Sequence, residues 1–151
     1  MRNRIGIMKV AAITIAPGSR LPTRSVNSVV AEARKGLVGD RYHGSRHRQV
    51  TLQSQEQLDR AAEDLGHGFD PGATRRNITV DAGEIPATPG TRITIGEAEF
   101  EVVRDAAPCR LLDDWIGPGA MKALRGRAGS ALRVLSTGTI QVGDTVEITS
   151  L

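Results

Sequence analysis

Cys109 is the residue best suited to covalent or metal chemistry, because it is the only cysteine among the 151 residues. It lies in Ala106-Ala107-Pro108-Cys109-Arg110-Leu111-Leu112, between the end of an expected strand and an expected helical turn. A helix N-terminus and the adjacent Arg110 both favour a thiolate. A thiolate is the species that attacks sulfur and that ligates soft metals. The alternative is a thiol that packs as a small apolar residue, as many free cysteines do.

Arginines gather beside glycines at three places, which suggests that they bind an anion. The planar guanidinium group bonds phosphate or carboxylate through two N–H groups, and glycines let a ligand approach the backbone closely. The three groups are Arg41, Arg46 and Arg48 near Gly36-Leu37-Val38-Gly39-Asp40-Arg41-Tyr42-His43-Gly44, then Arg75 and Arg76, then Arg125 and Arg127 around Gly126. We therefore expect a small anionic ligand rather than a long polyanion.

Each of these groups also has a purely structural interpretation. Asp40 could cap backbone amides in a tight turn and pair with Arg41, and Gly126-Arg127-Ala128-Gly129 could be a plain β-turn. Arg75 and Arg76 would project to opposite faces of an extended segment, so that one lines an interior and the other meets solvent. An arginine held inside a barrel mouth needs an anionic partner.

Composition limits the classes of partner. The 20 basic and 17 acidic residues leave a formal charge of only +3, and the aromatic residues are scarce. Nucleic-acid binding is therefore not expected, because it relies on strong positive charge and stacking side chains. No apolar segment is long enough to cross a membrane, and no cleavable leader or disulfide framework is evident. We expect a cytoplasmic protein.

The alternation of apolar residues predicts a mainly β fold with one clear helix. Strands are expected at Ile5–Ile15, Val26–Ala33 and Gln49–Leu52. A helix is expected near residues 54–65, with Ser54 and Gln57 forming a capping box and Gly66 ending it.

Two similar β patterns occupy the second half of the chain. Gly90–Glu97 continues into Ala98–Val103, and Gly138–Asp144 continues into Thr145–Ile148, and each pair is typical of a hairpin. Short helical segments are expected near residues 110–124. Together these elements predict one domain over residues 1–151, a closed or nearly closed β-barrel without open sheet edges.

The order of the motifs resembles the MOSC domain, which is named for the C-terminal part of molybdenum-cofactor sulfurases. The resemblance extends from about Val10 to Glu147. Its motifs are the glycine-rich segment from Gly36, Arg48-Gln49-Val50-Thr51-Leu52, Arg75-Arg76-Asn77-Ile78, Pro108-Cys109, Gly126-Arg127-Ala128-Gly129 and Gly138-Thr139-Ile140-Gln141-Val142-Gly143-Asp144.

This resemblance implies a barrel like that of pyruvate kinase and a binding site for the molybdenum cofactor, a phosphate-bearing pterin dithiolene (molybdopterin). Cys109 matches the family's single cysteine, which ligates molybdenum in amidoxime-reducing relatives and is proposed to carry sulfur as a persulfide in sulfurases. Arg75 and Asn77 match an Arg-x-Asn step that lies against the cofactor. Arg41 and Arg127 are the further arginines that we expect to bind it.

The resemblance leaves two functions open. One is a molybdenum-cofactor oxidoreductase that reduces N-hydroxylated compounds with electrons from a separate redox protein. The other is a non-enzymatic carrier of sulfur or cofactor that acts with a partner such as a sulfur donor. Larger relatives carry an additional N-terminal β-barrel domain, and sulfurases a pyridoxal-phosphate domain, for which this sequence shows no motif. Part of the pocket would then come from a partner or from a second copy in a homodimer.

Overall fold

The structure is a computed structural model that describes residues 8–19 and 21–149. The strands are β1 (Met8–Ile15), β2 (Arg24–Val26), β3 (Ser28–Glu32), β4 (Gly36–Leu37), β5 (Val50–Ser54), β6 (Ile78–Val80), β7 (Arg92–Ile95), β8 (Ala98–Asp105), β9 (Ser130–Ser136), β10 (Gly138–Gln141) and β11 (Thr145–Thr149). The helices are α1 (Gln55–Leu65), the short 3₁₀ helix η1 (Pro71–Thr74), α2 (Leu111–Trp115) and α3 (Ala120–Ala123).

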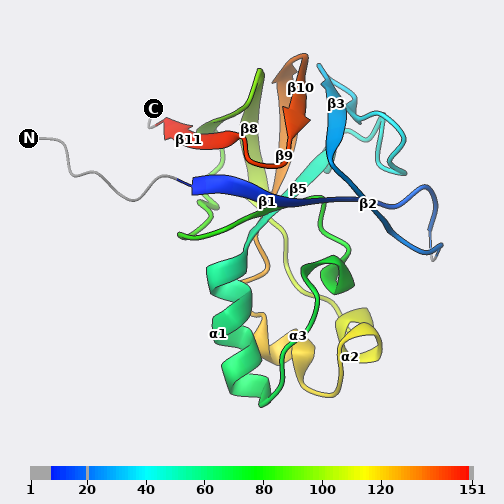
Figure 1. Cartoon of the computed structure of the whole chain (residues 1–151), viewed down its shortest axis with the longest axis vertical. Coiled ribbons are helices and arrows are strands. Elements are labelled where there is room, and N and C mark those ends of the chain that lie inside the picture. The colour runs from blue at the N-terminus through cyan, green and yellow to red at the C-terminus, as the bar shows by residue number, and fades with distance from the viewer. Residues whose placement is uncertain (1–7, 20, 150–151) are drawn as a thin grey trace, which may run out of the picture.

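A closed barrel forms the larger part of the fold (Figure 1). Its strands follow one another in the order β1, β11, β7, β8, β9, β5 and β6, and β6 pairs with β1 again. Neighbouring strands are antiparallel except β5 and β6, which are parallel. Closure leaves no unpaired edge within the ring, and β2 extends the sheet beyond β1. The expected mainly β barrel is confirmed.

The barrel interior is filled by aliphatic side chains and one phenylalanine. Leu52, Ile78, Phe100 and Leu132 are fully buried. Burial of such side chains stabilises the fold by about 1.5–3 kcal/mol each. This scarcity of aromatic residues in the core is what the composition predicts.

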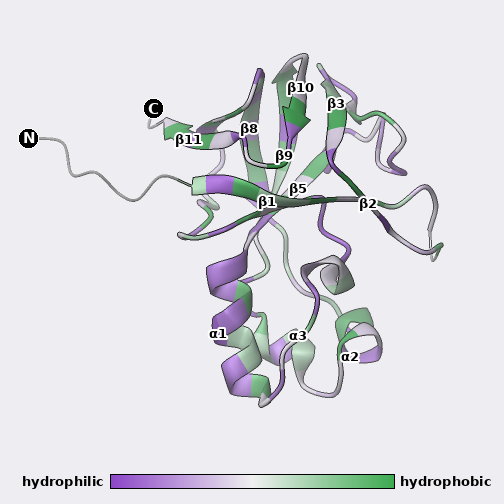
Figure 2. Cartoon of the chain, viewed as in Figure 1, coloured by the Kyte–Doolittle hydropathy of each residue, from purple (hydrophilic) through white to green (hydrophobic). Residues whose placement is uncertain are grey.

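A helical layer packs below the barrel, with its own small apolar core. Leu58 of α1, Leu112 of α2 and Leu124 after α3 are buried together. Figure 2 shows the outer side of α1 in hydrophilic colours, as expected for a helix that buries one face only. The predicted helix and the short helical segments near residues 110–124 are confirmed, and Gly66 ends α1 in the left-handed conformation. No helix of the described residues is long and apolar enough to cross a membrane.

The capping box at the start of α1 was a wrong prediction. Ser54 precedes the helix, but its side chain makes no cap hydrogen bond. Its hydroxyl instead donates to the carbonyl oxygen of Gly83, and the side-chain oxygen of Gln57 accepts from the amide of Ile85. Ser54 is fully buried under the segment that follows β6, so this tertiary contact replaces the local cap.

The first predicted hairpin forms, whereas the second does not. β7 and β8 pair from Arg92–Glu101 to Ile95–Ala98. β10 pairs with β3 in a separate sheet of the order β10-β3-β4, while β11 pairs with β7 and β1 in the barrel. The turn between β10 and β11 thus passes the chain from one sheet to the other. β10 and β11 do not form a hairpin with each other, because each is paired with strands that lie far away in the sequence.

Candidate functional site

Three segments meet where the barrel joins the helical layer. They are the loop of residues 38–49 between β4 and β5, the turn from η1 into β6, and the segment from β8 to α2 that carries Cys109. Each comes from a motif that the sequence singles out. Their polar side chains form a buried hydrogen-bond network and, next to it, a group of arginines.

Asn77 is the centre of the buried network and is only 3% exposed. Its Oδ1 accepts from the amide and the hydroxyl of Thr51 at 2.9 and 3.1 Å. Its Nδ2 donates to the carbonyl oxygen of Thr14 and to Asp40 Oδ1 at 3.1 and 3.2 Å. The amide group therefore has no hydrogen-bonding capacity left for a ligand, and its visible role is to hold β1, β5 and the glycine-rich loop together.

Asp40 ties the glycine-rich loop to the end of β1. Its Oδ1 also accepts from the amide of Ala16 at 2.9 Å, and its Oδ2 accepts from the amide of Tyr42 at 3.2 Å. These bonds confirm the expected capping of backbone amides. The expected pairing with Arg41 is wrong, because Arg41 Nη2 donates to the hydroxyl of Tyr42 instead.

Arg76 is the buried arginine of the adjacent pair, with 5% of its surface exposed. Its Nε donates to the carbonyl oxygen of Ala128 at 3.2 Å, and its Nη2 donates to those of Ala106 and Ala107 at 2.9 and 3.3 Å. These bonds hold the segment that leads into Cys109 against the entrance to β9. No hydrogen bond to the described residues involves Arg76 Nη1.

The charge of Arg76 is poorly compensated. Burial and the neighbouring Arg48 lower the pKa of Arg76 to about 10, while Cys109, Tyr42 and Asp105 act in the opposite direction. Arg76 remains a cation at neutral pH, but a lowered pKa means that its charged form is disfavoured here. A bound anion would relieve that penalty.

Tyr42 lies between two further guanidinium groups. Arg41 is 4.5 Å and Arg48 is 5.0 Å from the centre of the ring, both within the range of cation–π contacts. The Nε of Arg48 is buried and has no hydrogen-bond partner within residues 8–19 and 21–149. An orphaned donor of this kind is costly unless something outside the chain accepts from it.

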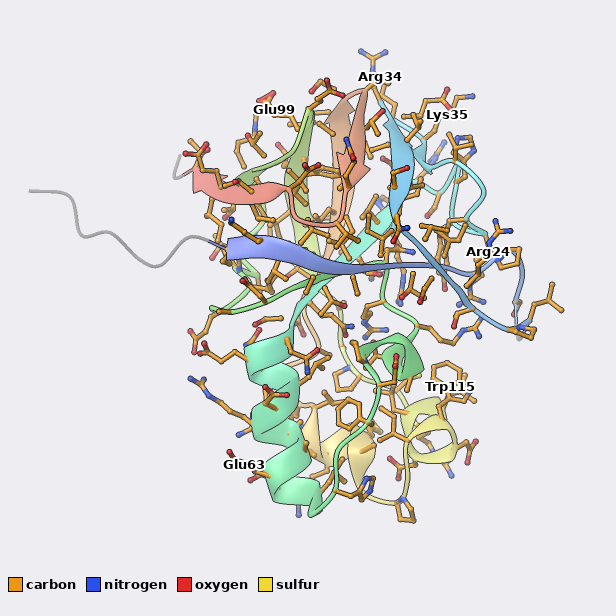
Figure 3. All side chains as sticks on the ribbon, in the orientation of Figure 1. Arg24, Arg34, Lys35, Glu63, Glu99 and Trp115 are labelled. Carbon is orange, nitrogen blue, oxygen red and sulfur yellow. The ribbon has the colours of Figure 1, made fainter. Side chains whose placement is uncertain are left out.

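Arg75 lies at the rim in the left-handed conformation, with φ of 61°. It donates to the carbonyl oxygens of Leu21 and Gly18, and it lies over the ring of Trp115 at 5.5 Å. Figure 3 shows Trp115 on α2, on the side of that helix turned toward the barrel. The guanidinium of Arg75 donates to Gly18, and the amide of Arg41 donates to the carbonyl oxygen of Ala16, so both arginines lie against the loop that follows β1. Burial and the charge of Arg41 lower the pKa of Arg75.

Cys109 is exposed and begins the turn into α2, where its carbonyl oxygen accepts from the amide of Leu112. Because α2 has only five residues, its dipole adds little. Arg76 donates to the carbonyl oxygen of Ala107, two residues before Cys109, and the charges of the two groups interact. The thiol is thus accessible and has a buried cation beside it.

Arg41, Arg48, Arg75 and Arg76, which we call the arginine cluster, have no carboxylate within ion-pair distance among residues 8–19 and 21–149. Arginines elsewhere do pair with acids, for example Arg60 with Glu56. Two of these guanidinium groups lie over Tyr42 and one over Trp115, and such a group of arginines without acidic partners among the described residues favours an anionic ligand.

The structure brings together only part of the predicted site. Arg41 and Arg75 belong to the cluster. Cys109 lies close to it, and Asn77 is in the buried network that holds its loop. Arg127 instead donates to Asp64 at 2.6 Å and to the carbonyl oxygen of Ala123, in the helical layer.

Sequence reasoning included Arg48 and Arg76 among the clustered arginines but did not select either of them as a cofactor-binding residue. The alternation of side chains along an extended segment predicts that one of Arg75 and Arg76 points inward. It does not predict which of the two is buried. Arg48 begins a motif of the resemblance, but that motif gives its side chain no role. Arg46 lines a separate hollow of about 380 Å³ with Arg34 and Arg133.

A hollow of about 560 Å³ next to Cys109 is less suited to an anion than the cluster. Arg110 and Leu111 line it together with Asp113 and Asp114. The two carboxylates would repel a negatively charged group. We therefore place the anion-binding part of the site at the arginine cluster.

Comparisons with known proteins agree with this fold. The model of the MOSC domain family matches residues 39–147. The YuaD protein of Bacillus subtilis has a similar structure, with a TM-score of 0.88, 18% identity and coverage of 97% of both chains.

Two YiiM proteins are also similar in structure. The one from Geobacillus stearothermophilus has a TM-score of 0.75 and 22% identity, over 95% of this chain and 75% of its own. The one from Escherichia coli has a TM-score of 0.72 and 18% identity, over 95% and 70%. No curated protein matches the sequence.

Proposed function

This chain belongs to the MOSC domain family, and from that premise we propose that it binds the molybdenum cofactor between the arginine cluster and Cys109. The observation that carries the proposal is a group of four arginines that have no carboxylate partner among the residues the structure describes, close to an exposed thiol. A phosphate-bearing dithiolene needs cations for its anionic groups and a soft ligand for its metal.

The residues present fit such a group. Arg48 has an orphaned buried Nε, and Arg76 has an Nη1 without a partner among the described residues. These two donors would bind anionic oxygens of the cofactor, with Arg41 and Arg75 closing the rim. Cys109 would supply the thiolate ligand. When bound, the cofactor supplies a metal that exchanges electrons with a substrate.

The chain's own contribution is to position these groups. Arg76 fixes the Cys109 segment through Ala106 and Ala107, and Asn77 fixes the loop that carries Arg41 and Arg48. We propose reduction of a small N-hydroxylated compound as the activity, with electrons from a separate redox protein. Since Cys109 is exposed and Arg41 and Arg75 are partly exposed, such a partner or a second copy of the chain could complete the pocket.

The cofactor proposal predicts the metal content of the purified protein. From cells that make the cofactor, the wild-type chain should carry molybdenum and pterin in comparable amounts. Cys109→Ser should lose most of the molybdenum because serine is a poor soft-metal ligand, and Arg48→Met should lose pterin as well. Metal analysis and fluorescence of the oxidised pterin measure both.

Arg60→Met is the matched control, because Arg60 pairs with Glu56 on the exposed side of α1 and should leave both contents unchanged. Wild-type protein free of molybdenum and pterin, or Cys109→Ser with an undiminished molybdenum content, would contradict the proposal.

A sulfur carrier is the second candidate, and the exposure of Cys109 favours it. A carrier must present its thiol to a donor and then to an acceptor, which a buried metal ligand does not require. In this case Cys109 would hold the sulfur as a persulfide, and the arginine cluster would act on the donor or acceptor.

A further inference from the structure

The surroundings of Cys109 include buried cationic groups. Arg76 is almost fully buried and donates to the carbonyl oxygen of Ala107, two residues before Cys109. It has no carboxylate within ion-pair distance in the described part of the chain. Arg48 adds a second cation, and its orphaned Nε is an independent sign of a missing acceptor. Cations in such a partly dry site attract an anionic reactant and stabilise an anionic leaving group.

We propose that Cys109 accepts sulfur directly from an anionic sulfane-sulfur donor, of which thiosulfate is the simplest, with Arg48 and Arg76 binding the oxygens of its sulfonate group. The proposal rests on the sulfur-carrying alternative above and identifies the class of donor. It requires neither a second protein domain nor the molybdenum cofactor.

The transfer balances without an external oxidant or reductant. The Cys109 thiolate attacks the outer sulfur of thiosulfate, and a bond forms between Sγ and that sulfur. The sulfur–sulfur bond of the donor breaks, and its electron pair leaves with sulfite. Thiolate and thiosulfate become persulfide anion and sulfite with the total charge unchanged. Cyanide then removes the outer sulfur as thiocyanate and returns the thiolate.

Arg76 and Arg48 would each donate a different hydrogen bond to the sulfonate group. Arg76 is fixed by three backbone carbonyls, so its free Nη1 offers a donor that need not be ordered when the substrate binds. Arg48 offers Nε from a side chain that lies against the ring of Tyr42. Two fixed cations suit a sulfonate, which spreads its charge over three oxygens, better than they suit a neutral disulfide.

The full chain with Cys109 reduced and thiosulfate as the donor provides the test. Intact-protein mass spectrometry should show the gain of one sulfur atom, and cyanide should release thiocyanate with turnover. Cys109→Ser should do neither. Arg48→Met should slow thiosulfate turnover by roughly tenfold or more, as expected for loss of a charge-assisted hydrogen bond, and Arg60→Met should leave it unchanged.

A neutral disulfide such as dithiodipyridine distinguishes an effect of the donor's charge from an effect on the accessibility of the Cys109 thiol. Its reaction with Cys109 should proceed at the same rate in wild-type protein and in Arg48→Met. A wild-type protein that gains no sulfur overturns the inference, as does an Arg48→Met variant that loses both reactions in the same proportion. Molybdenum and pterin in a protein that gains no sulfur would overturn this inference alone. Sulfur transfer by a protein that never carries the cofactor would overturn the cofactor proposal alone.

Discussion

Replacing Asn77 with leucine should destabilise the ligand-free protein by about 3–5 kcal/mol, because four hydrogen bonds of one buried amide are lost together. Leucine has a similar volume but no polar atoms, so the amide of Thr51 and the carbonyl oxygen of Thr14 each lose their Asn77 partner inside the protein. Urea unfolding followed by far-UV circular dichroism measures the change.

Asn27→Leu is the matched control for this substitution. Asn27 is exposed, and its replacement should change stability by less than about 0.5 kcal/mol. If Asn77→Leu were as mild as Asn27→Leu, the network would not support the site, and Asn77 would be free to act on a ligand directly. Loss of cofactor by Asn77→Leu in a fully stable protein would contradict the structural role in the same way.

Gly129→Ala is the second substitution expected to have a large effect. Gly129 precedes β9 with φ of 86°, and a Cβ atom there would overlap the carbonyl oxygen of Leu52 and lie 2.8 Å from its carbonyl carbon. Because the obstacle is backbone of β5, nothing can move aside cheaply. Overpacking and left-handed strain together should cost about 3–5 kcal/mol. Thermal unfolding and the yield of folded protein measure this loss.

The same motif offers the control. Gly126 also has a positive φ, of 74°, but a Cβ atom there would meet nothing within 4 Å. Gly126→Ala should therefore show the backbone strain alone, about 1–2 kcal/mol. Equal losses of stability in Gly126→Ala and Gly129→Ala would contradict the close approach of Gly129 to the backbone of β5.

These glycines also show what the sequence could predict about the fold. Alternating apolar residues identified the barrel strands, and Gly66 the end of α1, because those signals are local. The partner of each strand is decided by contacts distant in sequence. Gly138, for example, packs so closely on Glu97 that a Cβ atom would lie 2.5 Å from its carbonyl carbon. β10 likewise pairs with β3, far earlier in the chain. No local pattern predicts such distant contacts, so the hairpin predicted for β10 and β11 was wrong.

The site was predictable in its composition but not in its arrangement. The glycine-rich loop, the Arg75–Asn77 step and Cys109 do meet, as the order of motifs suggests. Alternation predicted one buried arginine in the adjacent pair, but Arg75 adopts a left-handed conformation in which simple alternation does not apply. Arg127 was selected for its glycine-flanked position, and its pairing with Asp64 depends on α1, which lies far away in the sequence.

The central claim is that the thiol of Cys109 and the arginine cluster form one ligand site. The rate of Cys109 alkylation by neutral iodoacetamide, measured with and without tungstate, tests it most directly. Tungstate bound to Arg48 and Arg76 would occupy the space beside the sulfur and compensate the charge there. The rate should therefore fall several-fold and saturably in the wild-type protein and stay constant in Arg48→Met. An alkylation rate that does not depend on tungstate in the wild-type protein, or that falls equally in Arg48→Met, would contradict a shared site of Cys109 and the arginine cluster.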